Sequence, residues 1–307
     1  YQLIAEDLIR YGSLVSIANK DGDTPLDKCK GAMAKRLHEI AVEMGQQLQK
    51  ITFKDQSWLG LKTRSRDATL SRHKGISFGD LSLGPRIDQT PSGDLFQGRW
   101  QGADIVAKVL RVKDVTPRVI RDFNEEFPKL RIFSHAHILP VLGACVHPPS
   151  LILISQRLPL GSLYSILHEE RGQGLLVDTS QAITFALHIA KGMAFLHGLE
   201  RNMPPFRLNS RHIMIEEDLT VRLNMADCTF SFEDRGKLWY PQWMAPEALQ
   251  KRMSEINTKA SDMWSFAVLL WELATRDVPF AELSPMEAGM KIALEGLRVS
   301  IPPGLSV

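Results

Sequence analysis

Apolar residues recur at helical spacing through residues 1–48. A first stripe ends at Gly12, and a second stripe follows the pair Thr24-Pro25. A threonine can cap a helix and a proline fits its first position, so we expect a helix to begin there. The second stripe comprises Met33, Leu37, Ile40, Met44 and Leu48. Helical spacing of this kind predicts two amphipathic helices packed on each other.

The pattern changes to short strands from Ile76 onward. The segments 81–83 and 94–97 flank a turn-rich stretch that contains Pro91, Ser92 and Gly93. Apolar residues alternate along 105–110, which predicts a half-buried strand. A helix is expected near 118–133, and further strands over 139–144 and 151–157.

Beyond Gly161 the pattern is mostly helical, and residues 264–273 are apolar on nearly every side. Such a helix belongs at the centre of a helical lobe. A small sheet-rich lobe followed by a larger helical lobe defines an α+β fold with two lobes. We place the first lobe at 76–158 and the second at 159–307, which we expect to be truncated.

The segment before these lobes resembles an ankyrin repeat. Its string Gly22-Asp23-Thr24-Pro25-Leu26 lies between helical stretches, as in that repeat family. Because repeat units need neighbours to bury their faces, we expect further repeats before residue 1. A plain helical hairpin is the alternative. Residues 49–75 are basic and aperiodic, which indicates an interdomain linker; contact with lipid or a partner is the other interpretation.

Composition restricts the class of protein. The chain has 307 residues, 44% of them hydrophobic, which is enough for a sizeable core. A net charge of +2 argues against a general nucleic-acid binder. Three cysteines without paired spacing are typical of a reducing compartment. We find no apolar run long enough for a transmembrane helix. We expect a fragment of a longer, cytoplasmic protein.

The candidate chemistry centres on residues 202–213. Their flanks place them where protein kinases have the catalytic loop H-R-D-L-x-x-x-N. In this alignment Arg207 replaces the aspartate that accepts the substrate proton, and His212 replaces the metal-binding asparagine. A guanidinium has only donors and does not lose its proton in a protein. The sequence therefore predicts a kinase-like domain without its catalytic base.

Other parts of a phosphoryl-transfer site are better preserved. Lys108 in Val106-Ala107-Lys108 fits the strand lysine that contacts phosphates, and Glu126 fits its helical partner, with Glu125 as the alternative. We expect Lys108 and Glu126 to pair. The glycine-rich loop is degraded, because Asp88 and Thr90 occupy glycine positions.

Further candidates complete the expected nucleotide site. Gly93 keeps the third glycine position of that loop, with Ser92 before it, and the hinge backbone at Gln156 and Leu158 would meet an adenine edge. Asp227 stands where the aspartate of D-F-G holds Mg²⁺, since a carboxylate is the hard ligand required. A polar loop aspartate is the alternative.

Downstream strings are the most specific evidence for the fold. Ala245-Pro246-Glu247 matches A-P-E, Asp262 stands before the buried helix, and 275–280 closes that helix. Asp262 is expected to accept backbone N–H bonds from the loop above it.

Over essentially the whole chain the sequence resembles the integrin-linked kinase family. The strings that carry the resemblance include 98–102, 130–135, 141–145, 161–164, 208–211 and 245–250. The resemblance implies a pseudokinase scaffold at focal adhesions that binds ATP and Mg²⁺ without useful turnover. It further implies a parvin calponin-homology domain bound through helix 287–297 at Met290 and Lys291, a PINCH LIM domain bound through upstream ankyrin repeats, and a contact with the integrin β tail. The chain departs from this family at two positions. Thr229 stands where the family has a lysine, and Arg207 stands where the family has a small residue.

Two other interpretations stay open at this point. The domain could be an active or weakly active serine/threonine kinase that recruits a base from elsewhere, with Lys108, Glu126 and Asp227 in its support. Alternatively, it binds no nucleotide and only packs against partners. Arg207 could pair with Glu126 or Asp227, or reach solvent, and His212 is more often a core or solvent-facing residue than a ligand.

Overall fold

The structure is a computed structural model, and it describes residues 2–11, 13–19, 21–46, 48–51, 75–131, 133, 135–169, 175, 177–199, 204–233, 239–252 and 255–301. Residues 52–74, which make up most of the predicted linker 49–75, lie outside the described residues. No helix in the described ranges has the length and apolar character that crossing a membrane requires.

The N-terminal segment contains three helices with a small core of their own. They are α1 (Gln2–Arg10), α2 (Pro25–Lys28) and α3 (Gly31–Glu43). Thr24 caps α2 in a reciprocal capping box with Asp27, and Pro25 takes its first position, as predicted. Ile9 packs against Leu37 and Ile40.

The predicted stripe on α1 is only partly buried. The stripe comprises Leu3, Ala5, Leu8 and Ile9; Leu3 and Leu8 are exposed at 76% and 54%, whereas Ile9 is 4% exposed. A helix of this length has room for one narrow stripe against α3, so the remaining apolar residues face solvent.

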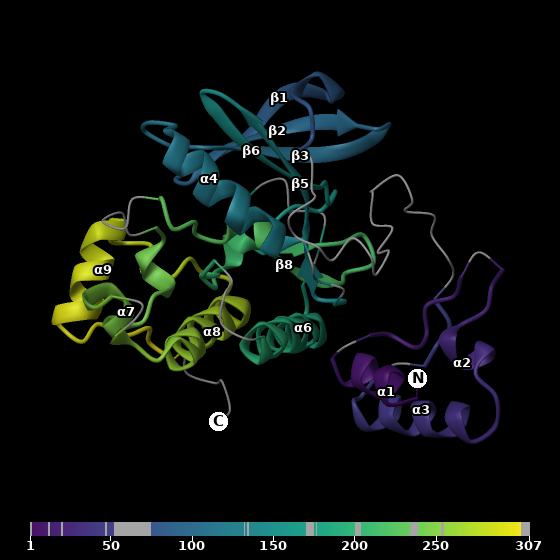
Figure 1. The fold of residues 1–307 in the computed structure, drawn as a ribbon. Helices are drawn as coiled ribbons and strands as arrows, with labels where there is room; N and C mark the ends of the chain where they lie inside the picture. The colour runs from purple at the N-terminus through teal and green to yellow at the C-terminus, as the bar shows by residue number, and fades with distance from the viewer. Residues whose placement is uncertain are drawn as a thin grey trace.

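A five-stranded antiparallel sheet forms the first lobe (Figure 1). Its spatial order is β1-β2-β3-β6-β5. The strands are β1 (Leu81–Thr90), β2 (Gly93–Trp100), β3 (Ala103–Leu110), β5 (Val141–His147) and β6 (Ser150–Gln156). The turn at 91–92 joins β1 and β2, as the sequence indicates. Pro85 lies in β1, an edge strand, where a missing backbone N–H is tolerated.

Strand β3 is buried on both faces, more than the predicted half-buried strand. Ile105 and Ala107 pack into one core with Ile152 and Ile154. Lys108, on the opposite face, is 2% exposed. Side chains alternate between faces along a strand, so this register turns Lys108 toward the second lobe.

Helix α4 (Pro117–Glu126) lies beside the sheet (Figure 1). Thr116 caps its first turn. The sequence predicts a helix as far as 133, but α4 ends at Glu126 and a 3₁₀ turn follows over Phe127–Leu130. Pro128 explains the early end, because its ring clashes with the preceding turn and it lacks an N–H.

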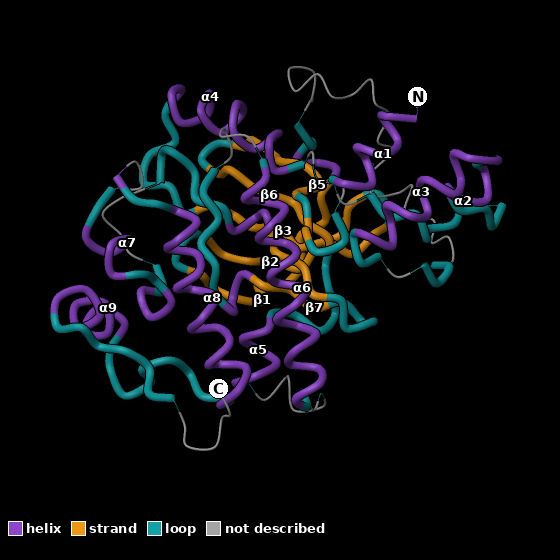
Figure 2. The backbone as a smooth tube through the Cα atoms, turned by 90° about the horizontal axis from the view of Figure 1, so that it is seen from below, coloured by secondary structure: helices purple, strands orange, loops and turns teal. Residues whose placement is uncertain are grey.

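The second lobe is mostly helical, with a small sheet of order β4-β8-β7 at its junction with the first. Figure 2 shows α6 and α8 side by side in front of the strands, in agreement with their mutual packing. The elements are β4 (Ile138–Leu139), α5 (Leu163–His168), α6 (Thr179–Gly198), β7 (Ile213–Ile215), β8 (Val221–Asn224), α7 (Pro246–Gln250), α8 (Thr258–Thr275) and α9 (Pro285–Leu294).

Helix α8 is the buried helix that the sequence predicts, with two differences. Val268 and Leu269 are buried, but Leu270 is 41% exposed. The helix begins at Thr258 under an Asn257 cap, so Asp262 stands in its second turn. Asp262 is therefore not at the helix start, where the sequence predicts it, and among the described residues its carboxylate contacts a side chain in place of the predicted backbone N–H groups. Its Oδ2 lies 2.8 Å from His197 Nε2.

His135, His137 and His188 lie together near β4 and α6, and His137 is buried. The rings of His137 and His188 stack at 4.3 Å, and His137 Nδ1 lies 3.1 Å from the Val221 carbonyl oxygen. Burial lowers the pKa of His137 to about 3 and that of His135 to about 4. The unfolded chain therefore takes up protons below pH 6.5 that the folded chain does not.

From this difference we expect the free energy of unfolding to fall as the pH drops from 7 to 5. His137 alone accounts for about 2 kcal/mol of that loss at pH 5. Glu233 and Asp262 have raised pKa values, which act in the opposite direction. The measurement is urea unfolding at both pH values. His137→Asn should remove about 2 kcal/mol of the difference. Equal pH differences in the original chain and in His137→Asn would contradict the assignment.

Candidate functional site

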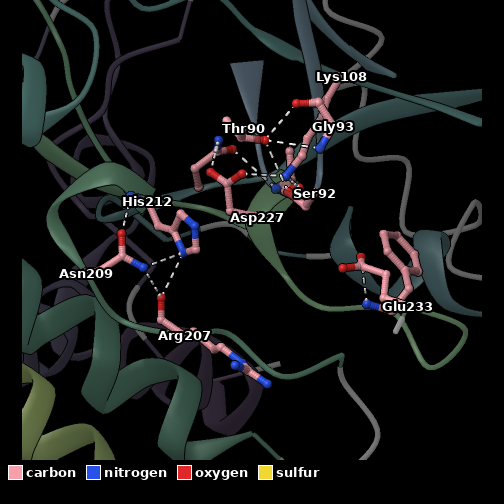
Figure 3. Close-up of polar contacts among 12 residues, drawn as sticks. Thr90, Ser92, Gly93, Lys108, Arg207, Asn209, His212, Asp227 and Glu233 are labelled. Atoms are coloured by element: carbon pink, nitrogen blue, oxygen red, sulfur yellow. Dashed lines mark hydrogen bonds and ion pairs between the residues drawn. The ribbon is translucent and has the colours of Figure 1, made fainter. Parts of the chain in front are cut away.

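Lys108 forms the centre of the candidate site. Its Nζ lies 2.6 Å from Asp227 Oδ1 and 3.0 Å from the Ala226 carbonyl oxygen. Pairing of β3 with β2 on one side and β6 on the other fixes the lysine in this position. The predicted strand lysine is thus joined to the predicted metal-binding aspartate (Figure 3).

Asp227 ends a 3₁₀ turn that follows β8, and both of its carboxylate oxygens have partners. Asn224 Nδ2 donates to Oδ2 at 2.8 Å, and Lys108 holds Oδ1. Burial by itself would raise the pKa of Asp227. The charges of Lys108 and His212, with the hydrogen bonds, outweigh burial and place that pKa below its ordinary value. Asp227 is therefore ionised at neutral pH.

The predicted Lys108–Glu126 pair is wrong. The Glu126 carboxylate instead accepts hydrogen bonds from Ser231, one from the backbone N–H at 3.0 Å and one from Oγ. Glu125, the alternative partner, is exposed. Lys108 has Asp227 as its counterion, so the helical glutamate is not needed to neutralise it.

An aromatic cluster explains where Glu126 goes. Phe123 of α4 lies 5.4 Å from Phe230 between ring centroids, and Phe230 stacks on Phe232 at 5.2 Å. These contacts hold the segment after Asp227 against α4 and bring Ser231 beneath Glu126. Spacing along the sequence gave no signal for this long-range contact.

Arg207 points away from Lys108 and Asp227 (Figure 3). It pairs with neither Glu126 nor Asp227. Its Nη1 contacts Met244 Sδ at 3.6 Å. Burial lowers the pKa of the Arg207 guanidinium, and the charge of Glu233 raises it in part. Since arginine keeps its proton in proteins, Arg207 remains a cation.

His212 packs within the loop and is half-buried. Its Nδ1 lies 2.8 Å from the Arg207 carbonyl oxygen and 3.0 Å from Asn209 Nδ2. Asn209 also accepts the backbone N–H groups of Arg211 and His212 at 3.0 and 3.2 Å. The histidine that replaces the metal-binding asparagine thus has contacts that stabilise the loop.

Glu233 is a site residue that sequence reasoning missed. Its Oε1 accepts the Phe230 N–H at 3.1 Å (Figure 3). Burial raises its pKa, and the charges of Lys108 and Arg207 lower it in part. The sequence offered only one signal for Glu233: it is a glutamate six positions after the D-F-G aspartate, and two phenylalanines come shortly before it.

The remaining predicted residues lie in the first lobe and in the hinge that follows it. Ser92 forms the β1–β2 turn, where its Oγ lies 3.3 Å from Thr90 Oγ1. Gly93 is required by packing, because an added Cβ would meet the Val109 carbonyl oxygen at 2.4 Å. Gln156 ends β6 and Leu158 is buried in the hinge that follows. The nucleotide role of these four residues stays a prediction.

Met290 and Lys291 lie on α9, away from these groups. Met290 is 57% exposed and Lys291 is half-buried. The predicted helix 287–297 ends earlier, at Leu294, because Gly296 takes a left-handed conformation that closes the last turn.

The arrangement of a five-stranded lobe, a helical lobe and a Lys–Asp pair between them is that of a protein kinase. Residues 81–306 match the model of the protein tyrosine and serine/threonine kinase family, and the chain belongs to that family. The fold is thus the predicted two-lobed α+β kinase fold.

Within that family the chain is similar to particular proteins. It is 55% identical over 284 residues to Scaffold protein ILK of Homo sapiens, covering 92% of this chain and 62% of that protein. It is 52% identical over 281 residues to Integrin-linked protein kinase homolog pat-4 of Caenorhabditis elegans, covering 91% and 60%. The identity is 29% over 234 residues to Probable serine/threonine-protein kinase drkA of Dictyostelium discoideum, covering 75% and 35%. The chain thus spans 62% or less of these relatives.

Lys108 and Asp227 have the chemistry that a nucleotide phosphate and its metal require. An ammonium suits phosphate oxygens and a carboxylate suits Mg²⁺. Within the described ranges no group of three histidine, cysteine or acidic side chains is placed to hold a metal ion.

Proposed function

We propose that this chain is part of a pseudokinase scaffold that binds ATP and Mg²⁺ without useful turnover. The observation that carries the proposal is Arg207, a cation turned away from the Lys108–Asp227 pair at the position of the catalytic base. A positioned base contributes roughly 10²–10⁴-fold to rate. His212 at the position of the second metal ligand increases the deficit.

Bound nucleotide would act on stability in this proposal. Lys108 would hold phosphate oxygens, with Ser92 and Gly93 above them and Gln156 and Leu158 at the adenine edge. Mg²⁺, held by Asp227, supplies neutralisation of phosphate charge when bound. A ligand that binds only the folded state at 100 times its dissociation constant adds about 2.7 kcal/mol to stability.

An active or weakly active serine/threonine kinase is the second candidate function, and Glu233 favours it. It is the carboxylate whose charge acts on both Arg207 and Lys108. One observation weighs against it as a base: its Oε1 is engaged by the Phe230 N–H.

The domain division is also part of the proposal: residues 1–48 as ankyrin-type repeats, 49–75 as a linker, 76–158 and 159–307 as the two lobes. Similarity to Scaffold protein ILK supports a scaffold that recruits proteins. We infer a cytoplasmic location at focal adhesions. The inferred partners are parvin through the kinase-like domain, PINCH through upstream repeats and the integrin β tail, a set that links integrins to actin.

Helix α9 supplies the support for parvin docking. Met286, Met290 and Leu294 are spaced four residues apart and are exposed at 76%, 57% and 72%. Residues four apart share a helix face, so α9 presents an apolar stripe to solvent. An amphipathic helix of this kind can insert into a groove on a partner.

We expect Met290→Ala/Lys291→Ala to lower capture of a parvin calponin-homology domain about tenfold, as for an interface hot spot. The measurement is a binding titration with the full chain. Met263→Ala/Lys251→Ala removes an exposed methionine and an exposed lysine elsewhere and is the matched control. Undiminished capture by the α9 variant would refute this docking face.

A further inference from the structure

A pocket of about 910 Å³ lies beneath the loop that carries Arg207. Its walls come from the end of α6, the loop 204–209, the segment before α7 and the start of α8. All residues that line it belong to the described part of the chain. We call it the Arg207 pocket. Its lining residues include Arg207 but neither Lys108 nor Asp227, and the Arg207 side chain points away from both (Figure 3).

Arg207 contributes a positive charge to this pocket. Its Nη1 contacts Met244 Sδ at 3.6 Å, and a thioether sulfur is a weak acceptor. No ion pair within the described ranges includes Arg207. A guanidinium has five N–H donors in a planar fork, so it has donors to offer a ligand.

The acidic residues that line the pocket have hydrogen-bond partners within the protein. Asp262 Oδ2 lies 2.8 Å from His197 Nε2, and Glu255 accepts the Arg252 N–H at 3.5 Å. Glu233 accepts the Phe230 N–H and is not among the lining residues. Phe206, Trp239 and Met244 also line the pocket, and Arg207 itself is half-buried. A charge-assisted hydrogen bond to this guanidinium is stronger than a hydrogen bond between neutral groups.

We propose that the Arg207 pocket binds an oxyanion side chain of a partner peptide, with the guanidinium as the donor. The inference rests on the proposed scaffold function and adds a second recognition site to the α9 face. In an active kinase this part of the loop meets the acceptor hydroxyl of a substrate peptide. In this chain the Arg207 side chain lines the pocket instead, and its donors attract a negatively charged side chain there. The oxyanion is the carboxylate of aspartate or glutamate, or the phosphate of a phosphorylated residue.

The test uses the full chain and three sets of labelled synthetic peptides with degenerate flanks. The fixed central residue is glutamate, phosphoserine or glutamine, and binding is measured by fluorescence anisotropy at low and high salt. We expect the glutamate or the phosphoserine set to bind about tenfold more tightly than the glutamine set, and salt to reduce this preference.

Variants assign the preference to one side chain. Arg207→Gln should bind all three sets alike, and Arg207→Lys, which keeps a point charge without the fork, should retain part of the preference. Arg99→Gln, at an exposed arginine on β2, is the matched control and should bind like the original chain. Thermal unfolding of each variant confirms that it is folded.

Each outcome has a defined meaning. Preference for glutamate identifies a carboxylate partner, and preference for phosphoserine alone identifies a phosphorylated one. Equal binding of the three sets by the original chain overturns the inference, as does a preference that survives in Arg207→Gln. Met290→Ala/Lys291→Ala should keep the preference. Parvin capture without any peptide preference would reject this inference and leave the proposed scaffold function standing.

Discussion

Replacing Glu272 by alanine is expected to lower the free energy of unfolding by about 3–5 kcal/mol. The Glu272 carboxylate is fully buried in α8. It accepts hydrogen bonds from Ser210 Oγ at 2.7 Å and Trp243 Nε1 at 2.9 Å, and His168 Nε2 lies 2.9 Å away. One side chain therefore joins α8 to α5, the catalytic-loop segment and the turn before α7. Alanine would leave these donors buried without an acceptor.

Chemical denaturation measures this effect, with two comparisons. Glu282→Ala, at an exposed glutamate, should change the stability by less than about 0.5 kcal/mol. Glu272→Gln, which keeps the shape but turns an NH₂ group toward the donors, should give an intermediate loss. A loss for Glu272→Ala no larger than for Glu282→Ala would show that the network does not hold the lobe together.

Replacing Lys108 by methionine is expected to have a similarly large effect, about 3–5 kcal/mol at neutral pH. The side chains of Lys108 and Asp227 are 2% and 9% exposed, and their atoms are 2.6 Å apart. Removing the ammonium leaves a buried carboxylate without its counterion. Because burial raises the pKa of an unpaired carboxyl, the loss should shrink as the pH falls and Asp227 takes up a proton.

A double-mutant cycle separates the pair from the fold around it. Lys108→Met/Asp227→Asn removes both charges and should recover much of the lost stability, since replacing a whole buried pair is far milder than breaking it. Additive losses in the double variant, or a loss in Lys108→Met that does not change with pH, would contradict a structural ion pair at this position.

Much of the fold could be predicted because its signals are local. The Thr24 cap, the turn at 91–92 and the alternation along β3 each depend on neighbouring residues. The early end of α4 had a local signal too, in Pro128, which outweighs the apolar periodicity beyond it. Asp262 was misplaced because the Asn257 cap, one turn earlier, starts α8.

The candidate site was less predictable, since it is built from long-range contacts. The sequence places Lys108, Glu126 and Asp227 at kinase positions, but it does not show which two of the three meet. The outcome depends on the contact of Phe123 with Phe230 and of Glu126 with Ser231. Each of these contacts joins two segments that are far apart in the sequence. The substitution at Arg207 could be read directly, whereas its turn toward Met244 required coordinates. Nothing in the spacing indicated Glu233.

The central claim is that this kinase-fold protein binds ATP without transferring its phosphate. Its most direct test measures both properties on one sample of the full chain. We predict that Mg-ATP at about 100 times its dissociation constant raises the unfolding free energy by about 2.7 kcal/mol. With the terminal phosphate labelled, we predict incorporation into a protein substrate no higher than for Asp227→Asn. Incorporation by the original chain that is lost in both Asp227→Asn and Glu233→Gln would contradict the claim.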